Sequence, residues 1–181
     1  MELPNSTLTN VTTTQTSVLL PKTLPQELVT HINSALGEEY AAHYFYRNAA
    51  NYCDGLGYTN AGEFFKKEAE SELEHAGKLQ KYLVDWNCTP VIPPIKFTGK
   101  FDNLIDVVNK AYAMEYGLGD KYNEISAKIF AQHLPTFDFL QEFRTLQVQA
   151  IAEYSDLLNG AQLVDVSNKL DIFHYEERYF G

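Results

Sequence analysis

Four long segments of the sequence repeat apolar residues at intervals of three and four, which gives an α-helix a single apolar face. Almost no runs of β-branched residues lie between them, so the sequence predicts an all-α fold. Three of the predicted helices cover about residues 25–53, 60–87 and 136–160, and another starts near residue 102 and ends before residue 135. A short amphipathic segment over residues 164–176 predicts a further helix near the C-terminus.

Local signals mark the ends of the first helical pair. Pro25 suits the first turn of the first helix, and Asp54-Gly55 is expected to end that helix. Asn60 is expected to cap the second helix, with Glu63 completing a capping box.

The lengths of the connections predict how the helices are arranged. Short connections of about five residues join the first helix to the second and the third to the fourth, so each pair should be antiparallel. Proline and glycine break any helix over residues 88–101. At about 3.3 Å per residue this segment reaches roughly 46 Å, which exceeds the length of about 42 Å expected for the second helix. The second and third helices should therefore run parallel, in a four-helix bundle with one long crossover.

The chain divides into three predicted parts. Residues 1–23 are rich in threonine and predict a flexible tail, residues 24–160 form the bundle, and residues 161–181 form a short C-terminal helix and tail. Cys53 and Cys88 should lie at opposite ends of the bundle, too far apart for a disulfide.

The charge balance narrows the possible partners. With 14 Lys and Arg against 24 Asp and Glu, the net charge of −10 disfavours nucleic acid and anionic membranes and permits a partner that is a cation. We expect a cytoplasmic protein, because no export signal or membrane-spanning segment is recognised and two cysteines fit a reducing compartment.

Acidic and polar residues interrupt the apolar faces near the middle of the predicted helices. Two of them, Glu72 and His75, are three residues apart and therefore project from one face of the second helix. No lysine or arginine shares these faces. The residues concerned are Glu39, Glu72, His75, Glu115 and Gln147.

The heights of these residues in the bundle can be compared along the helices. Glu39 and Glu72 lie roughly 21 and 18 Å from the turn that joins their helices, so they are level. The corresponding figures for Glu115 and Gln147 are about 25 and 17 Å, a poorer match unless the third helix ends before His133.

Three buried carboxylates at one height require a compensating positive charge. Divalent cations supply it, and two ions fit the ligands better than one. Glu39 and His75 can hold the first ion, Glu115 and Gln147 the second, and Glu72 can place one oxygen on each. Two ions held close together can deliver two electrons to one oxygen molecule, which favours iron over zinc.

Two assignments have alternatives. Glu38 is an alternative to Glu39 as the metal ligand. Glu39 is preferred because its spacing places it on the same helical face as Leu36 and Tyr46. Gln147 could equally be a polar residue that covers the site, and Tyr46 could serve only in packing.

The first two helices resemble those of the non-haem ferritins, both bacterial ferritins and eukaryotic H-type ferritins. Residues 37–46 resemble the family's first-helix motif, in which a metal-binding glutamate precedes a tyrosine by seven residues, corresponding to Glu39 and Tyr46. Residues 70–79 match the second-helix motif and imply Glu72 as the bridging ligand with His75 as its partner.

The resemblance extends over about residues 28–158. Glu115 matches the third-helix glutamate, and Gln147 matches the glutamine of the fourth helix. The resemblance implies an iron-storage ferroxidase: two Fe(II) ions are oxidised by O2, and ferric oxide mineral collects inside a 24-subunit homo-oligomeric cage. It also implies that Tyr46 hydrogen-bonds the carboxylates of the centre and is a candidate electron donor.

The sequence departs from some relatives of this family. Bacterioferritins and rubrerythrins carry a second Glu-x-x-His, which residues 147–150 lack, so both are disfavoured. Neither methionine is a convincing axial ligand, so no haem is expected. A third iron site found in some prokaryotic ferritins is also expected to be absent, because its positions match Ser71, Leu146, Gln149 and Ala150.

Two other functions stay open at this point. One is a structural cage subunit that binds metal but oxidises it weakly. The other is a di-iron oxidase acting on an organic substrate or a peroxide, which the missing second Glu-x-x-His opposes.

Overall fold

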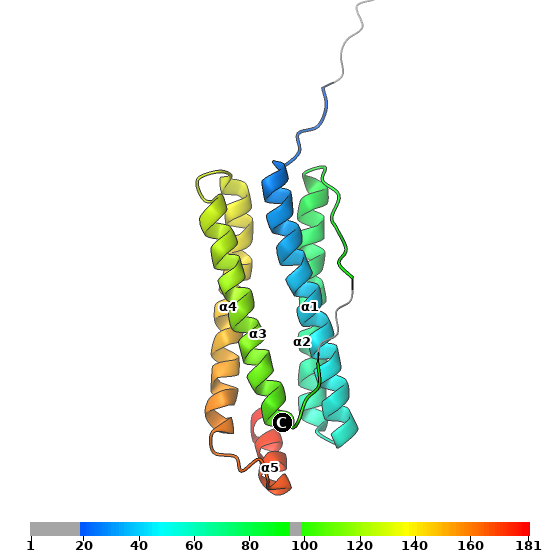
Figure 1. The fold of residues 1–181 in the computed structure, drawn as a ribbon, viewed down its shortest axis with the longest axis vertical. Helices are drawn as coiled ribbons and strands as arrows, with labels where there is room; N and C mark the ends of the chain where they lie inside the picture. The colour runs from blue at the N-terminus through cyan, green and yellow to red at the C-terminus, as the bar shows by residue number, and fades with distance from the viewer. Residues whose placement is uncertain (1–18, 95–98) are drawn as a thin grey trace, which may run out of the picture.

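The computed structural model describes residues 19–94 and 99–181. In this part of the chain there are five α-helices, and the predicted all-α fold is confirmed (Figure 1). In chain order they are α1 (Gln26–Leu56), α2 (Thr59–Asp85), α3 (Leu104–Ile129), α4 (Leu134–Ala161) and the shorter α5 (Lys169–Phe180). Most of the predicted flexible tail, residues 1–18, lies outside the described residues.

The four long helices form the predicted bundle with one long crossover. Helices α1 and α2 are antiparallel neighbours, and so are α3 and α4 (Figure 1). Helix α3 begins at the end of the bundle opposite to the end where α2 stops, so these two helices run in the same direction. Cys53 near the end of α1 and Cys88 just after α2 are both free thiols. None of the described helices is long and apolar enough to cross a membrane.

Helix α1 continues past its predicted end. The helix passes through Asp54-Gly55 and ends at Leu56. Its C-cap is Gly57, whose φ of 83° is the left-handed conformation that glycine adopts most easily. The backbone N–H of Tyr58 donates to the carbonyl of Cys53 at 2.9 Å, which closes a Schellman-type turn. The helix therefore stops at the glycine whose backbone conformation terminates it.

The predicted capping box at the start of α2 is wrong. Asn60 lies inside the helix, and Glu63 is exposed. The carboxylate of Glu176 on α5 accepts instead from the backbone N–H of Asn60 at 2.7 Å and from that of Ala61 at 3.0 Å. A residue from the far end of the chain thus supplies the acceptor that a helix N-terminus needs.

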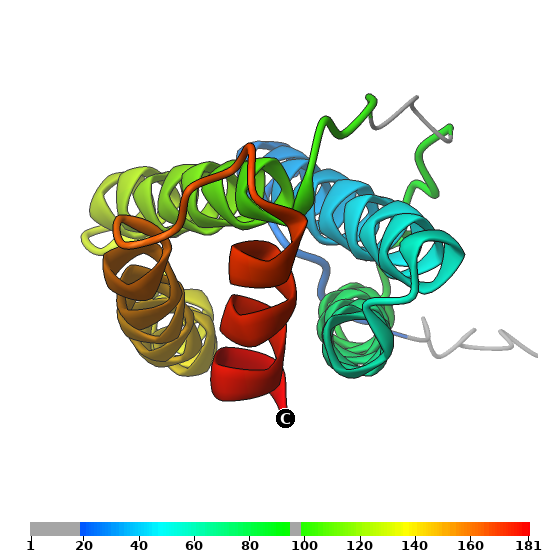
Figure 2. The same cartoon turned by 90° about the horizontal axis from the view of Figure 1, so that it is seen from below.

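The short C-terminal helix also begins later than predicted. It starts at Lys169, where Asn168 accepts from the backbone N–H of Leu170. Figure 2 shows α5 lying across the end of the bundle, between α2 and α4. The Tyr175 hydroxyl donates to the carbonyl of Leu157 on α4 at 2.8 Å, so α5 is bonded to both helices that flank it.

The turn between α3 and α4 decides the heights of the predicted ligands. Helix α3 ends at Ile129, before His133, and the His133 side chain caps α4 by accepting from the backbone N–H of Thr136. At about 1.5 Å per residue, Glu115 and Gln147 then lie about 21 and 20 Å from their helix ends. The mismatch in height disappears.

The apolar core is divided into two clusters by a layer of polar residues. One cluster includes Leu28, Ile32 and Leu36 of α1 and occupies the end of the bundle where α1 starts. The other includes Phe65 and Tyr154 and occupies the opposite end. The buried polar residues of the layer between them are Glu39, Glu72, Glu115 and Gln147.

Candidate metal centre

The predicted ligands lie in this layer and come from all four long helices. Glu39 and Glu115 are 0 % exposed, while Glu72 and Gln147 are each 4 % exposed. The side chain of His75 is 12 % exposed and lies beside them. Glu38, the competing candidate, is exposed, as the periodicity of α1 predicted.

Three of these residues form a compact cluster of donor atoms. His75 Nδ1 lies 3.1 Å from Glu72 Oε2 and 3.6 Å from Glu39 Oε2. One donor atom from each of the three residues lies within 4.8 Å of the other two. Two carboxylate oxygens and an imidazole nitrogen at this spacing can bind a transition metal ion.

Three buried oxygen atoms in the layer lack a hydrogen-bond donor among the described residues. They are Glu39 Oε2, Glu115 Oε2 and Gln147 Oε1. A buried acceptor without a partner costs about 1–3 kcal/mol, and more when it is charged. Such atoms require an explanation, and a bound cation would satisfy them together.

The remaining oxygens of the two fully buried glutamates accept hydrogen bonds from tyrosines. The Tyr46 hydroxyl on α1 donates to Glu115 Oε1, and the Tyr122 hydroxyl on α3 donates to Glu39 Oε1. Tyr122 was not predicted as a site residue from the sequence. Its signal was present, because Tyr122 follows Glu115 by seven residues, as Tyr46 follows Glu39.

Burial governs the protonation of the layer. Burial raises the pKa of Glu72 well above 4.5, and the negative charges of Glu39 and Glu115 add to this, although the hydrogen bond with His75 opposes it. Burial also raises the pKa of Glu115. For His75, burial alone would lower the pKa, but Glu39 and Glu72 outweigh it and raise the pKa to about 10. Without metal the layer therefore holds protons, which cations would displace.

Comparison with known proteins identifies the family of this chain. The sequence profile described as "Ferritin-like domain" matches residues 29–164, which is most of the chain. The chain belongs to the ferritin family. It is therefore an iron-storage protein of this family.

Individual ferritins agree in sequence and fold. A bacterial non-heme ferritin of Escherichia coli O6:H1 is 23 % identical over 148 residues, covering 81 % of this chain and 90 % of the relative. A chloroplastic ferritin of Phaseolus vulgaris is 30 % identical over 156 residues, covering 81 % of this chain and 61 % of the relative. The solved open-pore ferritin of Archaeoglobus fulgidus has the same fold, with a TM-score of 0.81 at 18 % identity over 87 % of this chain and 97 % of that one.

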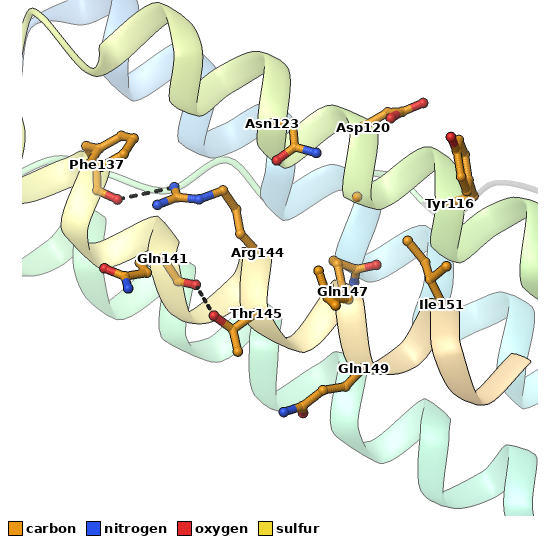
Figure 3. Close-up of a pocket in the computed structure, with 12 residues that line it drawn as sticks. Tyr116, Asp120, Asn123, Phe137, Gln141, Arg144, Thr145, Gln147, Gln149 and Ile151 are labelled. Atoms are coloured by element: carbon orange, nitrogen blue, oxygen red, sulfur yellow. Dashed lines mark hydrogen bonds between the residues drawn. The ribbon is translucent and has the colours of Figure 1, made fainter. Parts of the chain in front are cut away.

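A surface groove lies beside one residue of the polar layer, Gln147. Its volume is about 830 Å³, and it runs between α3 and α4, where Gln147 forms part of its lining (Figure 3). Gly119 of α3 also lines it, and an added Cβ there would lie 3.2 Å from Ile151 Cδ1 and 3.6 Å from Gln147 Cβ. A glycine therefore lets α3 approach α4 closely beside Gln147.

Among the residues that line the groove, Arg144 has the one positively charged side chain. The Arg144 guanidinium donates from Nη1 to Ser126 Oγ at 2.6 Å. It also donates to the Phe137 carbonyl at 3.3 Å, as Figure 3 shows. The guanidinium carbon, Arg144 Cζ, lies over the Phe137 ring, 4.4 Å from the ring centroid. These bonds hold the guanidinium against the α3 to α4 turn.

Glu68, one turn before Glu72 on α2, is a partly buried carboxylate whose contribution to stability depends on pH. Its pKa is raised from 4.5 to about 7, mainly by burial and further by the charges of Glu153 and Glu115. The native state therefore holds this proton more tightly than the unfolded state, so stability is lost as pH rises between these two values.

Replacing Glu68 with glutamine should make the metal-free protein more stable at neutral and alkaline pH. We expect a gain of about 2 kcal/mol in the free energy of unfolding near pH 8 and almost none near pH 4. Chemical unfolding across this range, with a chelator present, measures it. The exposed neighbour provides the control: Glu70→Gln should show no such trend. An equal gain at both ends of the range would contradict the assignment.

Proposed function

We propose that this ferritin-family chain oxidises Fe(II) with O2 at a di-iron ferroxidase centre within each subunit. The ferric product then collects as oxide mineral inside a cage, for which we propose 24 subunits. The observation that carries the proposal is the set of buried oxygens for which the described part of the chain offers no donor. They belong to α1, α3 and α4 and lie beside the Glu72 and His75 pair of α2.

The arrangement supports one division of ligands between two ions. Glu39 Oε2 and His75 Nδ1 lie together and suit the first ion. Glu115 and Gln147 each offer an oxygen without a donor among the described residues and suit the second. Glu72 approaches His75 with Oε2, which leaves its second oxygen for the other ion.

The chemistry follows from the substrate and from the protons that the site holds. Two bound Fe(II) ions can each give one electron to the same oxygen molecule, and the ferric product hydrolyses. The proton on His75 must leave before Nδ1 can bind a metal, so acid should weaken binding. The Tyr46 hydroxyl holds Glu115 in place, because burial raises the pKa of Tyr46 and keeps it a donor.

An aerobic titration with Fe(II) tests this function. Absorbance of the ferric product should rise in a fast phase whose amplitude grows until two Fe(II) per chain have been added, after which slower mineral growth takes over. A structural cage subunit with weak oxidase activity predicts slow oxidation without a break at that ratio. A di-iron oxidase of organic substrates predicts single-turnover oxidation without mineral.

The assembly and the location need separate measurements. Size-exclusion chromatography with light scattering would distinguish the proposed 24-subunit cage from a small oligomer. The cytoplasmic location stays a prediction, since one of the similar proteins is a chloroplastic ferritin.

A further inference from the structure

The two tyrosines of the polar layer form a reciprocal arrangement between α1 and α3. Each helix contributes a buried glutamate and, seven residues later, a buried tyrosine whose hydroxyl bonds the glutamate of the other helix. In both pairs the tyrosine hydroxyl donates to Oε1 of the glutamate, and Oε2 of that glutamate has no donor in the described part of the chain. The two glutamates are therefore presented in equivalent ways.

A carboxylate can bind a metal ion through one oxygen or through both. An oxygen that accepts a hydrogen bond has one lone pair engaged, and the donor also fixes the plane of the carboxylate. We propose that Tyr122 is a positioning residue that keeps Glu39 a one-oxygen ligand, through Oε2, as Tyr46 does for Glu115. This inference rests on the proposed di-iron centre.

Packing alone does not account for the hydroxyl of Tyr122. The ring lies against Phe143 with centroids 5.2 Å apart, and Phe143 in turn contacts the His75 ring at 6.0 Å. A phenylalanine at position 122 would keep these ring contacts. The hydroxyl adds one thing, which is the bond to Glu39.

Tyr154 provides a matched control in the same protein. It is also 0 % exposed, and its ring stacks on Tyr46 with centroids 6.1 Å apart. Its hydroxyl, however, has no hydrogen-bond partner among the residues described. Tyr154→Phe therefore removes a buried hydroxyl without removing a bond to a ligand.

Cobalt(II) binding under anaerobic conditions tests the inference without iron oxidation. The visible bands of Co(II) weaken as its coordination number rises, so they report how many oxygens bind. In Tyr122→Phe, Glu39 is free to chelate, and the absorbance per bound ion at the first site should fall about twofold. Affinity at that site should also fall about tenfold or more. Tyr154→Phe should match the parent in both.

The outcomes separate the inference from the proposed function. If the parent does not bind two Co(II) per chain, or if Glu72→Ala binds two Co(II) as tightly as the parent, the di-iron centre itself is wrong. If the parent binds two and Tyr122→Phe gives the same spectrum as Tyr154→Phe, the centre stands and the role of Tyr122 is overturned. Circular dichroism and melting of the metal-free variants check that both remain folded, and Tyr46→Phe should alter the spectrum of the second ion in the same direction.

Discussion

Replacing Glu72 with alanine should slow the fast phase of Fe(II) oxidation about tenfold or more, equivalent to at least about 1.4 kcal/mol of activation free energy. Glu72 is the ligand proposed to contact both ions, and it also lies 3.1 Å from His75. Its loss would leave each ion with fewer ligands and would leave the two ions unlinked. Stopped-flow absorbance of the ferric product, at two Fe(II) per chain, measures the effect.

The same helix supplies the control for this experiment. Glu70 is exposed, so Glu70→Ala changes the net charge by the same amount without touching the layer. Its fast phase should keep the rate of the parent. The fast phase of His75→Ala should be slowed to about the same extent as that of Glu72→Ala. Equal rates in Glu72→Ala and the parent would show that oxidation takes place elsewhere.

Replacing Glu176 with alanine should lower the free energy of unfolding by about 3 kcal/mol. This carboxylate is 4 % exposed and accepts three hydrogen bonds at the N-terminus of α2. Alanine would leave the backbone N–H groups of Asn60 and Ala61 without this acceptor and would remove the hydrogen bonds that join α5 to α2. Negative charge at a helix N-terminus also interacts favourably with the helix dipole.

Two further variants serve as controls for the Glu176 experiment. Glu177 is the exposed neighbour on α5, and Glu177→Ala should change stability by less than about 0.5 kcal/mol. Glu176→Gln keeps one acceptor oxygen and should recover part of the loss. Chemical unfolding followed by circular dichroism measures all three. If Glu176→Ala and Glu177→Ala unfold alike, the carboxylate does not hold α5 to α2.

The helices and their order could be predicted because each depends on local sequence. Apolar spacing produced the four long helices, and the length of the segment between α2 and α3 decided that these two run parallel. Interrupted apolar faces likewise pointed to Glu39, Glu72 and Glu115, because a buried charge disrupts a pattern that is otherwise regular. Helix periodicity carries this information without any tertiary contact.

Residues whose partners are distant in sequence could not be found in this way. Glu176 and Asn60 are 116 residues apart, and Tyr122 and Glu39 are 83 apart, so no local pattern joins either pair. A tyrosine on an apolar face is equally consistent with plain packing. A second Glu-x-x-x-x-x-x-Tyr spacing becomes meaningful only when α1 and α3 are brought side by side.

The sequence by itself determined that four amphipathic helices would pack with one crossover, that carboxylates would interrupt the apolar faces of three of them, and that Glu39 and Glu72 would lie at one height. Periodicity and connection length suffice for this, because they are properties of the unfolded chain as much as of the folded one. Only the tertiary structure decided which oxygen of Glu39 and of Glu115 accepts from a tyrosine and which lacks a donor among the described residues. Hydrogen bonds depend on distances and angles between side chains of different helices, and these are set only when the helices pack.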